Sequence, residues 1–199
     1  MHPHKRAKRS KKTDLEIDMS NPSISPVNDK VVFTSKSLKE FYTSPINKAF
    51  KQRVRHLWLI DLKSRKKIDL TEDSPKQYSA PKWSPDGRRI SFTSSSWDVY
   101  IKNMVNPSEG IVKVGAGYFS EWLNEKTLAI GGPEAINVYN IEKMEKINEA
   151  KFQPGFYPAD FSFGISNKLY YEDQTDNPDM DISYIDITTQ QKGKVIKDA

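Results

Sequence analysis

The 199-residue chain contains no cysteine, which excludes disulfide bonds, thiolate metal sites and a thiol nucleophile. It has three histidines, and only His56 lies beyond the N-terminal stretch. No apolar run approaches the roughly 18 residues that a membrane-spanning helix needs. The basic N-terminal stretch is not followed by an apolar segment, so we expect no secretory signal, no membrane span and a cytoplasmic location.

The motifs of catalytic and nucleotide-binding sites are also missing. The sequence has no Gly-x-Ser-x-Gly elbow, and His56 is the single histidine available to a Ser-His-Asp triad. It has neither a Walker loop nor a Gly-x-Gly-x-x-Gly phosphate cradle. The acidic segment "EDQTDNPDMD" (172–181) lacks the EF-hand spacing and is typical of a solvated turn. We therefore predict a protein that is not an enzyme and has no catalytic residue, no metal and no cofactor.

The positive charge is confined to one end of the chain. The formal net charge is +5, but residues 5–12 alone carry six Lys or Arg and no acid. Without them the chain has 25 basic and 26 acidic residues, so the rest lacks the basic surface of a nucleic-acid-binding protein. We expect residues 1–12 to be a disordered basic tail, and contact with nucleic acid only through this tail.

Much of the remaining sequence is a repeat. The segment "SPDGRRISFTS" (84–94) aligns with "SPVNDKVVFTS" (25–35), and weaker copies are "WLNEKTLAI" (122–130) and "FGISNKLYY" (163–171). In the best copy, Pro-Asp-Gly supplies a tight turn before an alternating apolar segment. Each copy therefore predicts two antiparallel strands joined by a turn.

A second motif, which we call the third-strand motif, follows each hairpin. It occurs as "LWLIDL" (57–62), "VYIKNM" (99–104), "INVYNI" (136–141) and "ISYIDI" (182–187). Its first, third and sixth residues are apolar, and its fifth is Asp or Asn, which can bond the backbone two residues later and begin a turn. A short outer strand is predicted after each motif. The segment 140–151, which has some helical character, therefore becomes strand, turn and strand.

These units predict an all-β protein. Four antiparallel strands that recur about every 40 residues are typical of β-propeller blades. We place the propeller at residues 13–199, with units at approximately 21–71, 80–115, 117–150 and 156–199. Four units either form a partial propeller, completed by missing blades or by a second copy in a homodimer, or close into a small four-bladed ring. We expect the partial propeller, because exposed sheet faces and edges favour pairing. Residues 13–20 alternate like an outer strand.

The stretch "PKWSPDGRRISFTS" (81–94) resembles the repeat of TolB-like propellers, a WD-repeat-like family. The same repeat builds the N-terminal propellers of prolyl oligopeptidase-family serine peptidases. The resemblance covers most of residues 21–199, although the third and fourth units lack the Ser-Pro-Asp-Gly turn. It implies a non-catalytic binding or scaffold module that engages a protein or peptide partner through the loop face of the propeller. The alternative that it implies is a peptidase propeller separated from its catalytic domain.

One segment is longer than the repeat requires. Between Ser35 and His56 the first unit carries 20 residues, where the second unit has Ser95 and Ser96. This insertion interleaves aromatic and basic residues, and we select as possible partner-binding residues Phe41, Tyr42, Phe50, Lys51, Arg53 and Arg55. Long loops in compact domains are often functional or disordered. The insertion is therefore either a docking segment for an acidic or peptide partner or a mobile surface flap.

Overall fold

The computed structural model describes residues 20–41, 50–152, 161–163, 168–173 and 181–195. These residues form four antiparallel sheets of four strands each, and no helix occurs among them. The first sheet comprises β1 (Ser20–Ile24), β2 (Lys30–Phe41), β3 (Phe50–Asp61) and β4 (Lys67–Asp69). The second comprises β5 (Tyr78–Trp83), β6 (Arg89–Ser94), β7 (Asp98–Asn103) and β8 (Ile111–Ala116). The third comprises β9 (Phe119–Asn124), β10 (Thr127–Gly131), β11 (Ala135–Asn140) and β12 (Glu145–Lys151), and the fourth β13 (Phe161–Phe163), β14 (Lys168–Asp173), β15 (Asp181–Asp186) and β16 (Lys192–Lys194).

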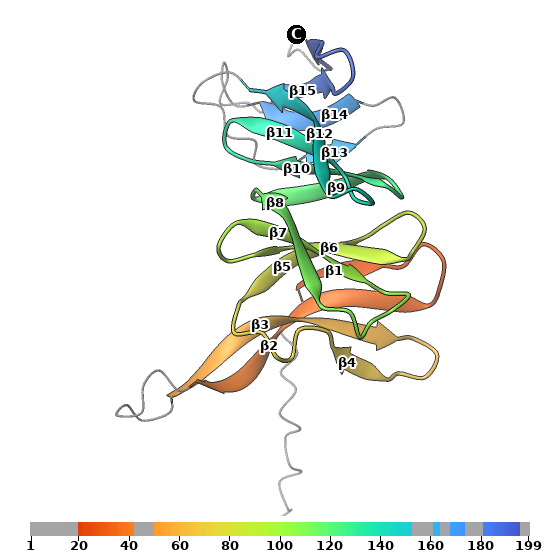
Figure 1. Cartoon of the computed structure of the whole chain (residues 1–199), viewed down its shortest axis with the longest axis vertical. Coiled ribbons are helices and arrows are strands. Elements are labelled where there is room, and N and C mark those ends of the chain that lie inside the picture. The colour runs from red at the N-terminus through yellow and green to blue at the C-terminus, as the bar shows by residue number, and fades with distance from the viewer. Residues whose placement is uncertain (1–19, 42–49, 153–160, 164–167, 174–180, 196–199) are drawn as a thin grey trace, which may run out of the picture.

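The sheets are blades that stack face to face. Within each sheet the strand order follows the chain, and Figure 1 shows the sheets succeeding one another from the first to the fourth. The first and the fourth sheet lie at opposite ends of the stack, so the ring is not closed (Figure 1). The predicted all-β fold of four-stranded propeller blades is confirmed, and its arrangement is the partial propeller rather than a closed four-bladed ring.

The third-strand motif explains how the blades pack. Its first and third residues face the next sheet, as Leu57 and Leu59 do in the core between the first and second sheets. Its sixth residue faces the preceding sheet, as Met104 does in that same core. The cores between the second and third sheets and between the third and fourth repeat this arrangement. Alternation within one strand thus supplies apolar side chains to two different cores.

The fifth residue of the motif forms the predicted turn in every blade. In each case its side-chain oxygen accepts hydrogen bonds from the backbone N–H groups two and three residues later. The pairs are Asp61 with Lys63 (3.1 Å) and Ser64 (2.8 Å), Asn103 with Val105 (3.0 Å) and Asn106 (3.4 Å), Asn140 with Glu142 (3.0 Å) and Lys143 (3.0 Å), and Asp186 with Thr188 (2.9 Å) and Thr189 (2.9 Å). The short polar side chain thus provides hydrogen-bond acceptors for N–H groups of the turn.

Two tryptophans join neighbouring blades through their first strands. The indole N–H of Trp83 in β5 donates to the carbonyl of Ser23 in β1 at 3.1 Å. The indole N–H of Trp122 in β9 donates in the same way to the carbonyl of Lys82 in β5 at 3.1 Å. Lys82 also forms an ion pair with Glu121 across this second joint. The two joints are structurally equivalent, which is a further sign of the repeat.

The Ser-Pro-Asp-Gly turn of the second blade packs closely against the corresponding turn of the first blade. Gly87 lies in the left-handed region at φ +65°, which favours glycine. A Cβ at this position would lie 2.3 Å from Cγ2 of Val27 in the corresponding turn of the first blade. The Ser84 hydroxyl donates to Asp86 Oδ1 at 2.6 Å within the same turn. Glycine is therefore needed both for the backbone conformation and for the close approach of two turns.

The other sequence predictions have mixed outcomes. The prediction of strand, turn and strand across 140–151 is confirmed by β11 and β12. A short outer strand follows the third-strand motif in the fourth blade as predicted, at Lys192–Lys194. The basic tail (1–12) and nearly all of the alternating segment 13–20 lie outside the described residues. Among the described residues, none forms a helix long and apolar enough to cross a membrane.

Candidate functional site

The strand order gives the propeller two different faces. In every blade the connection between the second and third strands leaves on the side where the chain passes to the next blade, and we call this side the loop face. The hairpin turns that join the first strand to the second and the third to the fourth lie on the opposite side, the turn face. The loop face therefore carries the connections that can vary in length without disturbing the blades.

The predicted insertion is a long β-ribbon on the loop face. The ladder between β2 and β3 continues without a break from Lys30 and Asp61 to Phe41 and Phe50. Figure 1 shows the two strands projecting together beyond the stack at the lower left. These parts of the insertion are therefore paired strands rather than an irregular loop. Whether the ribbon docks a partner or moves as a surface flap stays open.

The structure locates most of the predicted partner-binding residues on this ribbon. Phe41 and Phe50 form the last described ladder pair, while Lys51 and Arg53 occupy alternate positions on β3. Arg55 follows at the base of the ribbon, opposite Lys36, and is partly buried. Tyr42 lies outside the described residues. The backbone thus brings five of the six residues onto one element, and their part in binding stays a prediction.

A pair of exposed aromatic side chains occupies another part of the loop face. Trp97, between β6 and β7, is 57% exposed, and Tyr118, between β8 and β9, is 36% exposed. Their ring centroids are 4.8 Å apart with planes at 84°. Trp97 has φ +59°, a left-handed conformation that is rare for a bulky residue. A strained backbone that holds a large aromatic ring toward solvent is an indication of function.

Backbone hydrogen bonds hold the turns that carry this aromatic pair. The N–H of Trp97 donates to the carbonyl of Ser94 at 3.0 Å, and its carbonyl accepts from the N–H of Gly117 at 2.8 Å. The next N–H, that of Tyr118, donates to the carbonyl of Gly131 in the third blade at 2.8 Å. Two blades thus fix the pair at their joint. Rigid aromatic side chains lose little conformational entropy on binding and are frequent hot spots of protein interfaces.

The charged groups near the aromatic pair bond to neighbouring side chains. The Lys113 ammonium lies 2.6 Å from Asp98 Oδ1, and its hydrogen bond holds the pKa of the Asp98 carboxyl below its ordinary value. The Lys76 ammonium donates to the Tyr100 hydroxyl at 2.6 Å, which raises the pKa of Lys76. The Asp98 carboxylate compensates the charge of Lys113, whereas the Lys76 ammonium keeps its charge beside a neutral hydroxyl, so this part of the loop face combines aromatic rings with a positive charge.

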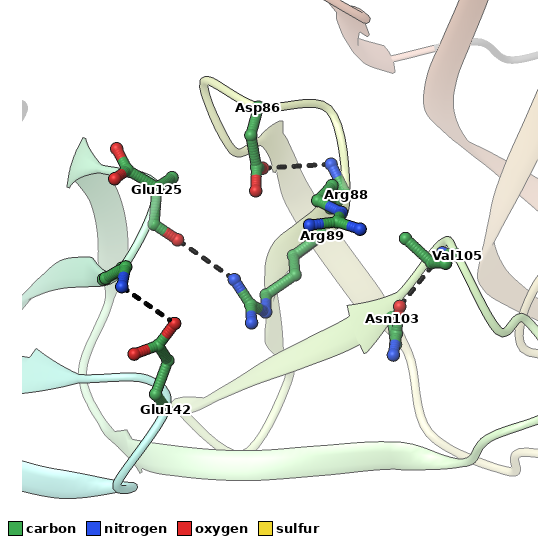
Figure 2. A pocket seen from close by; sticks show the side chains of 8 residues that line it. Asp86, Arg88, Arg89, Asn103, Val105, Glu125 and Glu142 are labelled. Atoms are coloured by element: carbon green, nitrogen blue, oxygen red, sulfur yellow. Dashed lines mark hydrogen bonds and ion pairs between the residues drawn. The ribbon is translucent and has the colours of Figure 1, made fainter.

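The turn face carries a polar groove between the second and third blades (Figure 2). It has a volume of about 380 Å³ and is lined by charged residues of both signs. The guanidinium of Arg89 donates to the carbonyl of Glu125 across the joint at 3.0 Å. Lys126 pairs with Glu142 at 3.3 Å within the third blade. One of these contacts, that of Arg89 with Glu125, crosses the joint between the second and third blades.

His56 is the one histidine in the described residues, and it is inaccessible. Its Nδ1 lies 2.7 Å from Asp69 Oδ2, and the ring is fully buried. Asp69 Oδ1 accepts the backbone N–H of Thr71 at 2.9 Å, so the pair belongs to a local network within the first sheet. Within the described ranges, no group of three or more His, Asp or Glu side chains is placed to hold a metal ion.

Sequence analysis missed the aromatic pair. Ser95 and Ser96 were aligned as a minimal connection between two strands, so the neighbouring Trp97 received no attention. The available signal was an aromatic residue inside a turn, at Trp97, where the blade alignment does not require one. That two such turns meet at a joint follows only from the three-dimensional arrangement.

Comparisons with known proteins support the fold. No protein-family model and no curated protein matches the sequence. Among solved structures, the WD40 repeats of RRP9 share 10% identity at a TM-score of 0.64, over 90% of this chain and 51% of that one. The β-propeller domain of the Trilobed protease from Pyrococcus furiosus, described as having an open velcro topology, shares 15% identity at a TM-score of 0.60, over 91% and 57%.

An enzyme with such a domain is also among the similar structures. The acylaminoacyl peptidase from Pyrococcus horikoshii shares 14% identity at a TM-score of 0.61, over 91% of this chain and 32% of that chain. The chain thus spans about half the length of the RRP9 repeats and of the Trilobed protease propeller. At these identities the likeness concerns architecture. The chain has the β-propeller fold of WD40-repeat and peptidase propeller domains, as the resemblance of its repeat implied.

Proposed function

We propose that the chain is a non-catalytic binding module of TolB-like type that engages a protein or peptide partner through its loop face. The observation that carries the proposal is the exposed Trp97–Tyr118 pair, which two blades hold in a fixed and partly strained conformation. Trp and Tyr dominate the energetics of many protein interfaces. The β2–β3 ribbon leaves from the same face and adds a second candidate contact surface.

The proposal that the protein is not an enzyme is supported by the described chemistry. His56 is buried against Asp69, away from any surface that a substrate reaches. A nucleophile elbow is absent from the sequence. The proposal keeps the cytoplasmic location predicted from the sequence, which fractionation of cells that express the protein tests. It also includes a second copy of the chain as a partner that covers the ends of the stack and leaves the loop face accessible.

A peptidase propeller is the second candidate function. The 15% and 14% identities to the propeller of the Trilobed protease and to an acylaminoacyl peptidase favour it. In this case the loop face would meet a catalytic domain instead of a separate partner. A reading frame that continues from this sequence into a domain with a Gly-x-Ser-x-Gly elbow would decide for this candidate.

Selection from a phage-displayed library of random peptides tests the binding function. We expect peptides enriched on the native protein to bind Trp97→Ala about 30-fold more weakly, the effect of a typical interface hot spot. Val105→Ala, which removes an exposed apolar side chain from the turn face, is the matched control and should leave binding unchanged. Failure to enrich any peptide, or equal binding to Trp97→Ala, would count against the loop face as the site.

The ribbon is tested with the same peptides. If Lys51 and Arg53 contact an acidic partner, the double variant Lys51→Glu, Arg53→Glu weakens binding, and added salt weakens binding to the native protein. Lys143→Glu, which reverses a charge on the turn face, is the control. Unchanged binding by the double variant would restrict the site to the aromatic pair.

A further inference from the structure

The two ends of the blade stack expose residues whose counterparts at the internal joints are buried or, at Met104, partly buried. The sixth residue of the third-strand motif is 4% exposed at Ile141 and 5% at Ile187, but 50% exposed at Leu62 in the first blade. At the other end, Ile182 opens the motif of the fourth blade and is 38% exposed, whereas its counterparts Val99 and Ile136 are both 0% exposed. The same residue positions thus lose their partners only where the stack ends.

The first end surface is formed by the outward side of the first sheet. Ile24 occupies the position of the joint-forming Trp83 and Trp122, and it is 71% exposed because no blade precedes it. Ile24 and Val31 are ladder partners, and Val31 is only partly buried. Leu62 extends this apolar surface along the third strand. The first blade therefore carries the apolar residues of an inter-blade joint, but no blade among the described residues packs against them.

The last end surface is the outward side of the fourth sheet. Tyr170 and Tyr184 are ladder partners with ring centroids 6.1 Å apart, and both are partly buried. The Tyr184 ring lies against the backbone of Gly193, where an added Cβ would approach a ring atom to 2.6 Å. The Lys168 ammonium lies 4.3 Å from the centroid of the Tyr184 ring. Together with Ile182 these residues form a mainly aromatic surface, whereas the first end surface is aliphatic.

We propose that a second copy of this chain closes the propeller, with the last end surface of each copy packed on the first end surface of the other. This inference extends the second-copy partner of the proposed function and does not depend on peptide binding at the loop face. Each copy would contribute four blades, so the ring would have eight, within the usual range of about 4–8. The match of this chain to 51% of the RRP9 repeat structure agrees with a half ring.

A twofold axis relates the two new joints in such a ring. Each joint repeats the internal pattern, in which the first and third residues of one motif face the sixth residue of the next blade's motif. Ile182 and Tyr184 of one copy would thus meet Leu62 of the other. Closed symmetry also protects both end surfaces at once, whereas a joint that does not close would lead to a filament.

Sedimentation equilibrium of the 199-residue chain tests the proposal. We expect a species of twice the chain mass of 22.9 kDa that dissociates on dilution. Leu62→Asp and Ile182→Asp should each raise the dimer dissociation constant about 30-fold or more, because each places a charge in both joints. Val105→Asp is the control, since Val105 is 61% exposed on the turn face and belongs to neither end surface.

A mixture of the two variants distinguishes the head-to-tail ring from other dimers. Mixing Leu62→Asp with Ile182→Asp leaves one joint with two native surfaces, so dimers should reappear. A dimer formed through the first end surfaces alone would be lost in Leu62→Asp and retained in Ile182→Asp, which would overturn the proposal. The proposal would also be overturned if the protein were monomeric at all concentrations, or if it formed filaments of increasing length. Ile24→Asp, at a position even more exposed in the single copy, replaces Leu62→Asp if that variant does not fold.

Discussion

At the scale of single residues, the joints between blades depend on a few hydrogen bonds that the repeat places at equivalent positions. The indole groups of Trp83 and Trp122 donate to backbone carbonyls of the preceding blade, at Ser23 and Lys82. These bonds connect residues far apart in the sequence, and each joins a side chain of one blade to the backbone of the preceding blade. A side chain of this kind contributes both apolar area and a polar contact to one joint.

We predict that Trp83→Phe and Trp122→Phe each destabilise the protein by about 2 kcal/mol, because each removes a hydrogen bond to a backbone carbonyl and leaves a smaller side chain in the core. Urea unfolding followed by circular dichroism measures the change. Trp97→Phe makes the same chemical change at an exposed position and should cost less than about 0.5 kcal/mol. Equal effects at all three positions would show that the indole bonds do not stabilise the joints.

The turn residues Asp61 and Asp186 predict a dependence on pH. Hydrogen bonds from the backbone N–H groups of Ser64 and Thr189, respectively, make the largest contribution to lowering the pKa of these carboxyls below the ordinary value of 3.8. The unfolded chain therefore takes up protons at a higher pH than the folded chain. The stability that these carboxylates contribute is present above pH 3.8 and is lost as the pH falls through their lowered folded values.

Asp61→Asn and Asp186→Asn should reduce this loss and keep the turns, since Asn103 and Asn140 already form the same turn in the second and third blades. Urea midpoints measured between about pH 6 and pH 3 give the slope of stability against pH. The reverse change Asn140→Asp should make the loss in acid steeper. If the slopes of all three variants match that of the native chain, these turns do not determine the acid sensitivity.

At the scale of elements, the sequence predicts the strands of the blades better than it predicts the ribbon and the aromatic pair on the loop face. The third-strand motif identifies the third strand of every blade, because its six residues must pack against the sheets on both sides. The insertion after Ser35 looked like a loop because its charged and aromatic residues hide the alternation of a strand. The insertion forms a ribbon because β2 and β3 keep the same pairing register beyond the sheet as within it. The Trp97–Tyr118 pair needed the contact between two blades, which no local pattern encodes.

The ribbon should be dispensable for folding beyond Ser37 and Val54. Residues 38–41 and 50–53 pair only with each other in the ladder, whereas Val54 is buried. We predict that replacing residues 38–53 by Asn-Gly, which forms a two-residue hairpin turn, changes the free energy of unfolding by less than about 0.5 kcal/mol. Urea unfolding measures it. Extending the deletion to residues 36–55 removes Val54 and should destabilise the protein, and a shorter deletion that already unfolds it would contradict this view.

At the scale of the whole molecule, stability is a sum over joints. In a stacked repeat each blade contacts only its neighbours, so a terminal blade has one joint where an internal blade has two. The three cores of this chain join four sheets in this manner. The end blades therefore have the least support, and any partner that packs on an end surface adds a joint of the same kind as the internal ones.

A tandem fusion of two copies in one polypeptide tests this view of the molecule. If the two end surfaces are joint surfaces, the fusion closes both joints within one chain, and the second joint no longer depends on protein concentration. We predict that the fusion is monomeric and unfolds at a higher urea concentration than the single chain, with a midpoint that dilution does not change. The single chain should instead lose stability on dilution.

Placing Leu62→Asp in both copies of the fusion provides the control. It puts a charge in each of the two new joints and leaves all internal joints intact. The midpoint of this variant should fall to that of the isolated single chain carrying the same substitution. A fusion that is no more stable than the dilute single chain would show that the end surfaces do not recognise each other, and that the exposed Leu62 and Ile182 await a different partner.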